Sequence, residues 1–206
     1  MRISVTDLDN FRYWRQDEDM TLDDLRGRLL HRDPPSEAML AGTALHHALE
    51  HASEQTAHSL SALGYTFVFD IDAAIALPVV RELKAVKEYD LDGRKVRVVG
   101  KVDGLHGKRV DDHKTTSSTF DAEKYLDTWQ WRYYLDIFEA DTFRWNVFQM
   151  RAGEPTEYVV TNLHPLETCR YPGLQADCER HLRDFLELVD QHIPEYAAQQ
   201  AAKDAA

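Results

Sequence analysis

The sequence predicts one α/β (α+β) domain in which a central mixed β-sheet is flanked by helices. A chain of 206 residues with 43% hydrophobic residues is long and apolar enough to form one large domain with a hydrophobic core. Helical and β-type patterns alternate in the order helix, β-meander, helix, two strands, helix. Two hairpin signals, Asp92-Gly93 and Gly107-Lys108, fall inside the meander. We therefore expect residues 1–206 to form a single domain.

The first quarter of the chain is predicted to be helical. Residues 4–30 read as one or two helices of mixed polarity, and Pro34-Pro35 then interrupts the chain. Ser36 is a suitable N-cap for the next helix, which we expect to end near Gly64. This helix carries an apolar stripe at helical spacing, formed by Ala41, Leu45, Ala48, Leu49 and Ala52.

The middle of the chain is predicted to form the sheet. Residues 65–78 are rich in β-formers, and residues 81–116 read as three strands. Asp92-Gly93 indicates a type I′ turn between the first two strands, and Gly107 as first central residue suits a type II′ turn before the third.

The last part returns to helices around two further strands. Residues 121–139 are predicted to form an aromatic-rich helix, and residues 143–152 and 156–164 two strands. A final helix is expected over residues 166–192, followed by a tail, residues 195–206, expected to fray. The stripe of the final helix consists of Leu174, Cys178, Leu182, Phe185 and Val189.

Charge and cysteine content exclude several classes of protein. The net charge of -12 argues against a general polyanion binder. Residues 81–114 nevertheless hold ten Lys/Arg against seven Asp/Glu, which allows either one basic face or ordinary solvated surface charge. No apolar run reaches the ~18 residues of a membrane span, and no secretory signal is visible. Cys169 and Cys178 read as reduced thiols, too few for an iron–sulfur cluster, so we expect a cytoplasmic protein.

Acidic residues of the meander are predicted to meet on one face. A two-residue turn at Gly107-Lys108 places Asp103 opposite Asp112, with Lys114 two residues further along on the same face. The first hairpin brings Glu82 opposite Asp103 unless a bulge changes the register. Such a patch needs a cation, and a hard divalent ion with oxygen ligands suits it. The alternative is a surface cluster whose carboxylates point into water.

Two polar residues on predicted helices could join this patch. His46 lies next to the apolar stripe and shares a line with Gly42, which suits a close approach of helix to sheet. The alternative is a satisfied core histidine. Gln130 is a polar residue on an apolar face shared with Tyr134, and the alternative for it is a buried structural amide.

The order of these motifs resembles the RecB-like branch of the PD-(D/E)XK nuclease superfamily, which includes phage-type exonucleases. The four motifs are Gly42 to His46, Gly100-x-x-Asp103, Asp112-x-Lys114 and Gln130-x-x-x-Tyr134. The resemblance covers residues 36–140 and implies a restriction-endonuclease-like core. It also implies one or two Mg²⁺ or Mn²⁺ ions held by His46, Asp103, Asp112 and the carbonyl oxygen of His113.

The resemblance also implies the roles of the remaining residues. Lys114 would be the catalytic lysine beside Asp103 and Asp112, either as a base or as a stabiliser of negative charge. Gln130 and Tyr134 would contact DNA or position the lysine, and Glu82 is the best match for an acidic residue often found before the Gly-x-x-Asp motif. The aromatic residues Trp129, Trp131 and Tyr133 would either stack on bases or belong to the core.

Three functions stay open at this point. The favoured hypothesis is a metal-dependent DNA exonuclease in recombination, repair or phage DNA processing. The acidic composition suggests help in binding DNA from a single-strand annealing or other recombination protein, or from a homo-oligomer. The alternatives are an endonuclease of the same fold and a catalytically silent nucleic-acid-binding or scaffold module.

Overall fold

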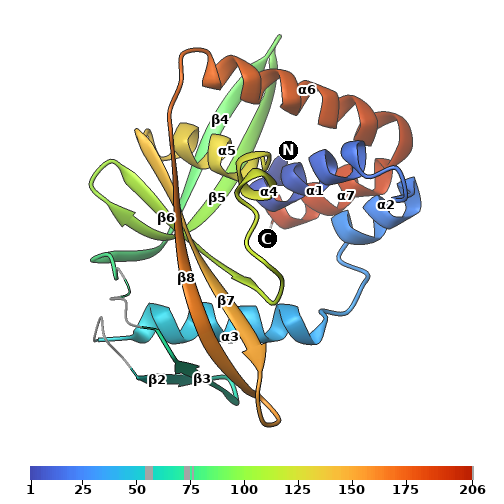
Figure 1. Ribbon diagram of the computed structural model, residues 1–206. Helices are drawn as coiled ribbons and strands as arrows, with labels where there is room; N and C mark the ends of the chain where they lie inside the picture. The colour runs from blue at the N-terminus through green and yellow to red at the C-terminus, as the bar shows by residue number, and fades with distance from the viewer. Residues whose placement is uncertain (54–57, 72–74, 76, 206) are drawn as a thin grey trace.

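An eight-stranded mixed β-sheet forms the centre of the computed structural model, which describes residues 1–53, 58–71, 75 and 77–205 (Figure 1). Within this part of the chain the strands are β1 (Arg2–Ser4), β2 (Ser59–Ala62), β3 (Tyr65–Phe69), β4 (Val80–Leu91), β5 (Arg94–His106), β6 (Arg109–Thr116), β7 (Thr142–Ala152) and β8 (Glu157–Cys169). Their order is β1-β5-β6-β7-β8-β3-β2, with β4 paired to β5.

The sheet is mixed in its strand directions. β1 runs parallel to β5, β6 to β7 and β3 to β8, while the other pairs are antiparallel. The predicted fold class, a central mixed sheet flanked by helices, is confirmed.

Helices cover the sheet in two groups (Figure 1). The described helices are α1 (Val5–Gln16), α2 (Leu22–Leu29), α3 (Glu37–His51), α4 (Ala122–Leu126), α5 (Gln130–Ile137), α6 (Leu174–His192) and α7 (Pro194–Ala205). The larger core cluster joins α1, α2, α5, α6 and α7 to the sheet, and the smaller one joins α3 to β3, β7 and β8. α3 therefore packs apart from the other helices; a loop, residues 30–36, leads to it from α2, and strands β2 to β6 follow it before α4.

Both predicted hairpin turns have the expected geometry. Asp92 and Gly93 have φ values of 57° and 87° between the paired residues Leu91 and Arg94, as a type I′ turn requires. Gly107 has a φ of 63° in the two-residue turn between His106 and Arg109.

The helix expected to reach Gly64 is shorter than predicted. α3 ends at His51, and Ser59–Ala62 forms β2 because these residues pair with Tyr65–Val68 of β3. Part of the intervening stretch, residues 54–57, lies outside the described residues, as do residues 72–74 and 76 of the predicted β segment. The predicted stripe of α3 is buried, from Ala41 at 0% exposure to Ala52 at 9%.

The C-terminal part also differs from the prediction. β8 continues to Cys169 because residues 166–169 pair with β7, so the last long helix begins at Leu174 rather than at residue 166. The tail forms α7 instead of fraying, because Tyr196 is buried and its hydroxyl donates to Asp7 Oδ2 at 2.8 Å. The single helix expected over residues 121–139 is divided into α4 and α5.

A buried carboxylate, Asp136, ties α5 to the sheet. The Tyr89 hydroxyl donates to Asp136 Oδ2 at 2.7 Å, and Lys87 Nζ and Arg170 Nη2 lie 2.9 and 3.1 Å from Oδ1. Asp136 is fully buried, and these partners compensate its charge. The network connects α5 to β4 and to Arg170, which follows β8.

We expect Asp136→Asn to lower the free energy of unfolding by about 1–3 kcal/mol, because a neutral amide cannot balance the two cations. Urea denaturation at neutral pH measures this loss. Asp190→Asn is the matched control, since the Asp190–Arg94 pair is half-exposed and its loss should change stability by only about 0.5 kcal/mol. Equal effects of the two substitutions would contradict the importance of the network.

His181 of α6 is a buried neutral histidine. Its ring stacks on Trp129 with centroids 4.0 Å apart, and its Nδ1 lies 3.1 Å from the Tyr133 hydroxyl. Burial, reinforced by the positive charges of Arg15, Arg132 and Arg12, lowers the pKa of His181 to about 3. Between this value and the ordinary pKa near 6.5, only the unfolded chain takes up the proton.

Acidification from pH 6 to pH 5 should therefore destabilise the wild-type chain more than a His181→Phe variant. The expected difference is about 1 kcal/mol per pH unit, which is slightly less than the limiting slope for one proton. Chemical denaturation across this pH range measures it for both proteins. Parallel pH profiles of wild type and variant would show that His181 is not the titrating group.

Candidate active site

The candidate site begins at an irregularity in β5. Val102 and Leu105 both pack against the larger core cluster although they are three residues apart, so the alternation of the strand shifts between them. On the neighbouring strand, Glu82 has a φ of 54°, and the ladder pairs Arg81 and Leu83 but not Glu82. Asp103 lies within this shift, so its side chain does not follow the regular alternation between the two faces of the sheet.

Asp103 joins three elements through its two carboxylate oxygens. The pairing of β5 with β6 ends at Gly104 and Asp111, and the next residue outward on β5 is Asp103. Its Oδ2 accepts the backbone N–H of His113 at 2.6 Å, and its Oδ1 lies 3.1 Å from His46 Nδ1. Asp103 thereby connects β5 to β6 and to α3 at the point where the two strands separate.

Asp112 and Lys114 follow on β6. Asp112 is buried, whereas the side chain of Lys114 is about one-third exposed. Lys114 Nζ lies 2.9 Å from Asp112 Oδ2 and donates to Oδ1 at 3.2 Å. The lysine therefore holds the inner carboxylate, while part of its side chain stays exposed.

Helix α3 reaches the site because it carries a glycine. A Cβ on Gly42 would lie 3.2 Å from Thr115 Oγ1 of β6, so the helix approaches this strand closely. His46 follows one turn later and faces Asp103. The expected close approach at Gly42 is confirmed.

Arg81 holds the other end of α3. Its Nη1 donates to the carbonyl oxygens of Leu49, Glu50 and Ala52 at 3.0, 2.8 and 2.8 Å. These are the carbonyls that a helix C-terminus leaves without partners. The role of Arg81 is not predictable from sequence, because its partners are backbone atoms about 30 residues away.

Helix α5 covers the carboxylates. Gln130 Nε2 donates to the Tyr134 hydroxyl at 3.2 Å, and Tyr134 is 4% exposed. A Cβ on Gly100 would meet Tyr134 Cε1 at 3.0 Å and Ile137 Cδ1 at 3.2 Å, so any larger residue would require these side chains to shift. The glycine of Gly100-x-x-Asp103 thus shapes the site through packing.

Two further predicted residues lie at its edge. The register of β4 with β5 places Glu82 opposite Asp103, as expected, because Arg81 pairs with Gly104 and Leu83 with Val102. The Glu82 carboxylate forms an ion pair with Lys101, two residues before Asp103 on β5. The side chain of His113 is buried against Phe148 of the smaller core, with ring centroids 5.7 Å apart. It contacts the site in two ways: its backbone N–H donates to Asp103, and its ring lies edge-on to that of His46, with centroids 6.1 Å apart.

The charges of the site depend strongly on one another. Burial raises the pKa of Asp112 to about 6. The positive charge of Lys114 lowers this pKa, and the negative charge of Asp103 raises it. Burial alone would also raise the pKa of Asp103, but the hydrogen bond and charge of His46, with His113 and Lys114, lower it to about 2. Burial opposes the charge of Lys114, yet Asp112 and Asp103 outweigh it and raise the pKa of the lysine.

The donor chemistry of these residues fits a divalent cation. Two carboxylates share a shielded place, and burial raises the pKa of Asp112 despite the charge of Lys114, so a further cation would stabilise its ionised form. Because a carboxylate oxygen accepts, neutral His46 carries its proton on Nδ1 and its lone pair on Nε2. Within the described residues, no three His, Cys, Asp or Glu side chains are already arranged around one point as an ion site.

The aromatic residues near Gln130 divide between core and site. Trp131 and Tyr133 are buried at 5% and 0% exposure, which contradicts a base-stacking role for them, and Trp129 is covered by His181. Tyr125 of α4 was not identified from sequence. Burial raises its pKa, with Lys114 and Asp112 close enough to influence it.

The fold is similar to solved structures of low sequence identity. A phage-related exonuclease from Haemophilus somnus 129PT matches with a TM-score of 0.56 at 10% identity, over 95% of this chain and 96% of that one. LHK-Exo, an alkaline exonuclease from Laribacter hongkongensis solved in complex with dAMP, matches with a TM-score of 0.51 at 14% identity, over 98% and 93%. A protein described as SSO0001 matches with a TM-score of 0.54 at 17% identity, over 91% and 75%.

No family model and no curated protein sequence matches the chain. The structural likenesses therefore show the fold. None of the helices in the described residues combines the length and apolarity needed to cross a membrane.

We expect Gly100→Ala to destabilise the chain by about 1–3 kcal/mol, because the added methyl group overlaps the buried ring of Tyr134 and the side chain of Ile137. Urea denaturation measures the loss. Trimming the second obstacle in a Gly100→Ala/Ile137→Val variant should recover part of it. A cost below about 0.5 kcal/mol for Gly100→Ala alone would contradict the close packing of α5 on β5.

Proposed function

We propose that the chain is a divalent-metal-dependent deoxyribonuclease of the RecB-like, phage-type branch of the PD-(D/E)XK superfamily, acting as an exonuclease. The observation that carries the proposal is the meeting of Asp103, Asp112 and Lys114 at the point where β5 and β6 separate. Two carboxylates and a lysine at one shielded place suit hydrolysis of a phosphodiester bond.

The fold likeness supports the same reading. Two of the similar structures are described as exonucleases, and each match covers more than nine-tenths of both chains. One of them holds dAMP, a mononucleotide of the kind that an exonuclease releases. Exonuclease action is therefore preferred over endonuclease action for this chain.

Asp103, Asp112 and His46 would hold one or two Mg²⁺ or Mn²⁺ ions, with the carbonyl oxygen of His113 as a further ligand. When bound, such an ion supplies Lewis acidity and a water molecule of lowered pKa. The imidazole nitrogen of His46 makes Mn²⁺ more acceptable than an all-oxygen site would. The hydrogen bond from His113 N–H to Asp103 keeps this carboxylate oriented.

Lys114 would act on the phosphate through its positive charge. Its ammonium group contacts both oxygens of Asp112, and its side chain is about one-third exposed. A positive charge fixed there stabilises the extra negative charge of the transition state. Of the two roles considered, charge stabilisation fits this arrangement better than proton abstraction.

The α5 residues would position the lysine and the DNA strand. Tyr134 packs over Gly100 and accepts from Gln130, so its ring limits the space above the two carboxylates. Glu82 would act indirectly, because its ion pair holds Lys101 beside Asp103.

The acidic composition affects how tightly the chain can bind DNA. A net charge of -12 opposes the binding of a polyanion, so contacts beyond the site would be few. A recombination protein such as a single-strand annealing protein, or further copies of this chain, would supply the missing affinity in recombination, repair or phage DNA processing.

The test is degradation of 5′- and 3′-labelled linear duplex, linear single-stranded and closed circular DNA with Mg²⁺, Mn²⁺ or EDTA. We expect metal-dependent loss of linear DNA, reduced at least about 100-fold by Lys114→Ala. Lys124→Ala on the neighbouring helix α4 is the matched control, because it removes an exposed lysine and should leave the rate unchanged.

Other outcomes would redirect the proposal. Cleavage of closed circles would assign endonuclease action to the same site. Equal rates for wild type and Lys114→Ala would refute the assignment of the site. Absence of cleavage by folded protein, with DNA still bound, would favour a nucleic-acid-binding or scaffold module.

A further inference from the structure

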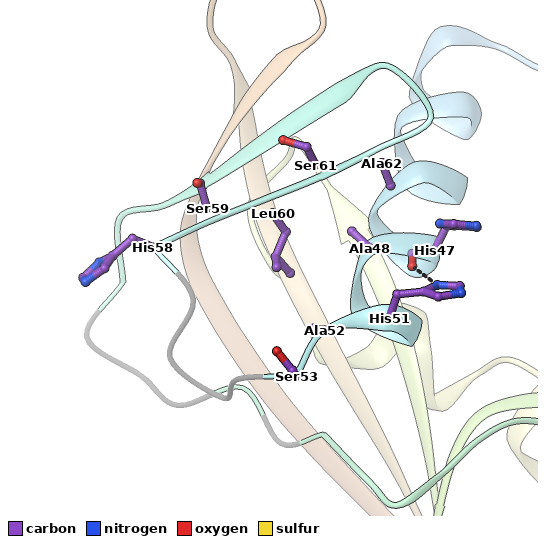
Figure 2. A pocket seen from close by; sticks show the side chains of 10 residues that line it. All are labelled: His47, Ala48, His51, Ala52, Ser53, His58, Ser59, Leu60, Ser61 and Ala62. Atoms are coloured by element: carbon purple, nitrogen blue, oxygen red, sulfur yellow. Dashed lines mark hydrogen bonds between the residues drawn. The ribbon is translucent and has the colours of Figure 1, made fainter.

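We propose that His47 and His51 form a second metal site on α3, separate from the candidate active site, which binds a borderline divalent transition metal such as Zn²⁺ or Ni²⁺. The two histidines lie one turn apart on the exposed side of the helix, with ring centroids 4.4 Å apart and ring planes inclined by 21° (Figure 2). Histidines four residues apart on one helix face can share a metal ion.

The hydrogen bond of His51 prepares its ring for metal binding. His51 Nδ1 lies 2.9 Å from the backbone carbonyl oxygen of His47, drawn as a dashed line in Figure 2. A carbonyl oxygen only accepts, so Nδ1 must carry the proton, and the lone pair of the neutral ring is on Nε2. Metal-binding histidines usually donate their other ring N–H to a carbonyl or carboxylate in this way.

His47 offers the second nitrogen without breaking another contact. Among the described residues, the ring nitrogens of His47 take part in no hydrogen bond or ion pair, and its ring stacks on His51. Its side chain is exposed, so an ion reaches it directly from solvent. Both rings project from the same side of α3, while His58 points away from them (Figure 2).

The surroundings leave room for further ligands. The two histidines line a cavity of about 520 Å³ between the end of α3 and strand β2, together with Ser59 and Ser61. Within the described residues no third His, Cys, Asp or Glu joins them as a ligand, so water molecules would complete the coordination. Glu50 Oε2 lies 3.8 Å from His51 Nδ1, and its negative charge favours a cation nearby.

Ligand type separates this site from the candidate active site. Two imidazole nitrogens favour Zn²⁺, Ni²⁺ or Cu²⁺, whereas the carboxylates around Asp103 favour harder ions such as Mg²⁺. His46 is the neighbour of His47 in sequence, but it faces Asp103 on another side of the helix. The two sites therefore take different metals from adjacent faces of α3.

The test is isothermal titration of Zn²⁺ into the full chain carrying Asp112→Asn, which weakens cation binding at the candidate active site. We expect one Zn²⁺ whose affinity falls at least about tenfold on His47→Ala and on His51→Ala. His31→Asn is the matched control, since it removes an exposed histidine whose φ of 53° suits asparagine, and it should leave the affinity unchanged.

Nitrogen NMR of the imidazole rings provides an independent readout. It should show the His51 proton on Nδ1 before addition of metal, and Zn²⁺ should shift the signals of His47 and His51. An unchanged Zn²⁺ affinity in either alanine variant would overturn the proposal. So would a His51 ring protonated only on Nε2, or loss of the affinity in the His31→Asn control. These outcomes do not depend on nuclease activity.

Discussion

The two hydrogen bonds of Asp103 hold the candidate site together. One carboxylate joins the N–H of His113 on β6 and the imidazole of His46 on α3, at 2.6 and 3.1 Å. Charge-assisted bonds of this kind are stronger than neutral ones, and they fall where the pairing of β5 with β6 ends. Without Asp103, helix α3 would keep its apolar contacts and its Arg81 cap but lose the hydrogen bond that connects His46 to β5.

The two carboxylates of the site differ in their electrostatics. Asp103 is stabilised as an anion by His46, whereas burial raises the pKa of Asp112. Lys114 contacts both oxygens of Asp112, and its charge lowers this pKa more than the charge of Asp103 raises it, so burial is the main cause. Perturbed charges of this kind are common at functional sites, because a group that is fully satisfied in the free protein has little left to offer a substrate. The contrast with Asp136 is informative, since that buried carboxylate is balanced by a hydroxyl and two cations and serves the fold.

Local signals predicted a large part of the structure. Asp92-Gly93 and Gly107 encode their turns through backbone preferences, and the turn at Gly107 sets the register that leads to Asp103 and Asp112. The stripe of α3 and the glycine at position 42 predicted a helix lying close on a strand, as found. Local patterns were misleading where contacts with residues far away in the chain determine the secondary structure. Strand β2 exists because it pairs with β3, β8 extends to Cys169 because it pairs with β7, and α7 is anchored because Tyr196 reaches Asp7.

The sequence by itself determined the fold class, the two hairpins and the residue types that gather at the candidate site. Each of these depends on neighbours within a few positions, where periodicity and turn preference are direct. Only the tertiary structure decided that the alternation of β5 changes between Val102 and Leu105, and that Glu82, which lies opposite Asp103, forms its ion pair with Lys101. It also decided that Arg81 caps α3 and that the rings of Trp131 and Tyr133 belong to the core. These features depend on contacts between distant segments, and packing free energy selects them only once the whole chain is folded.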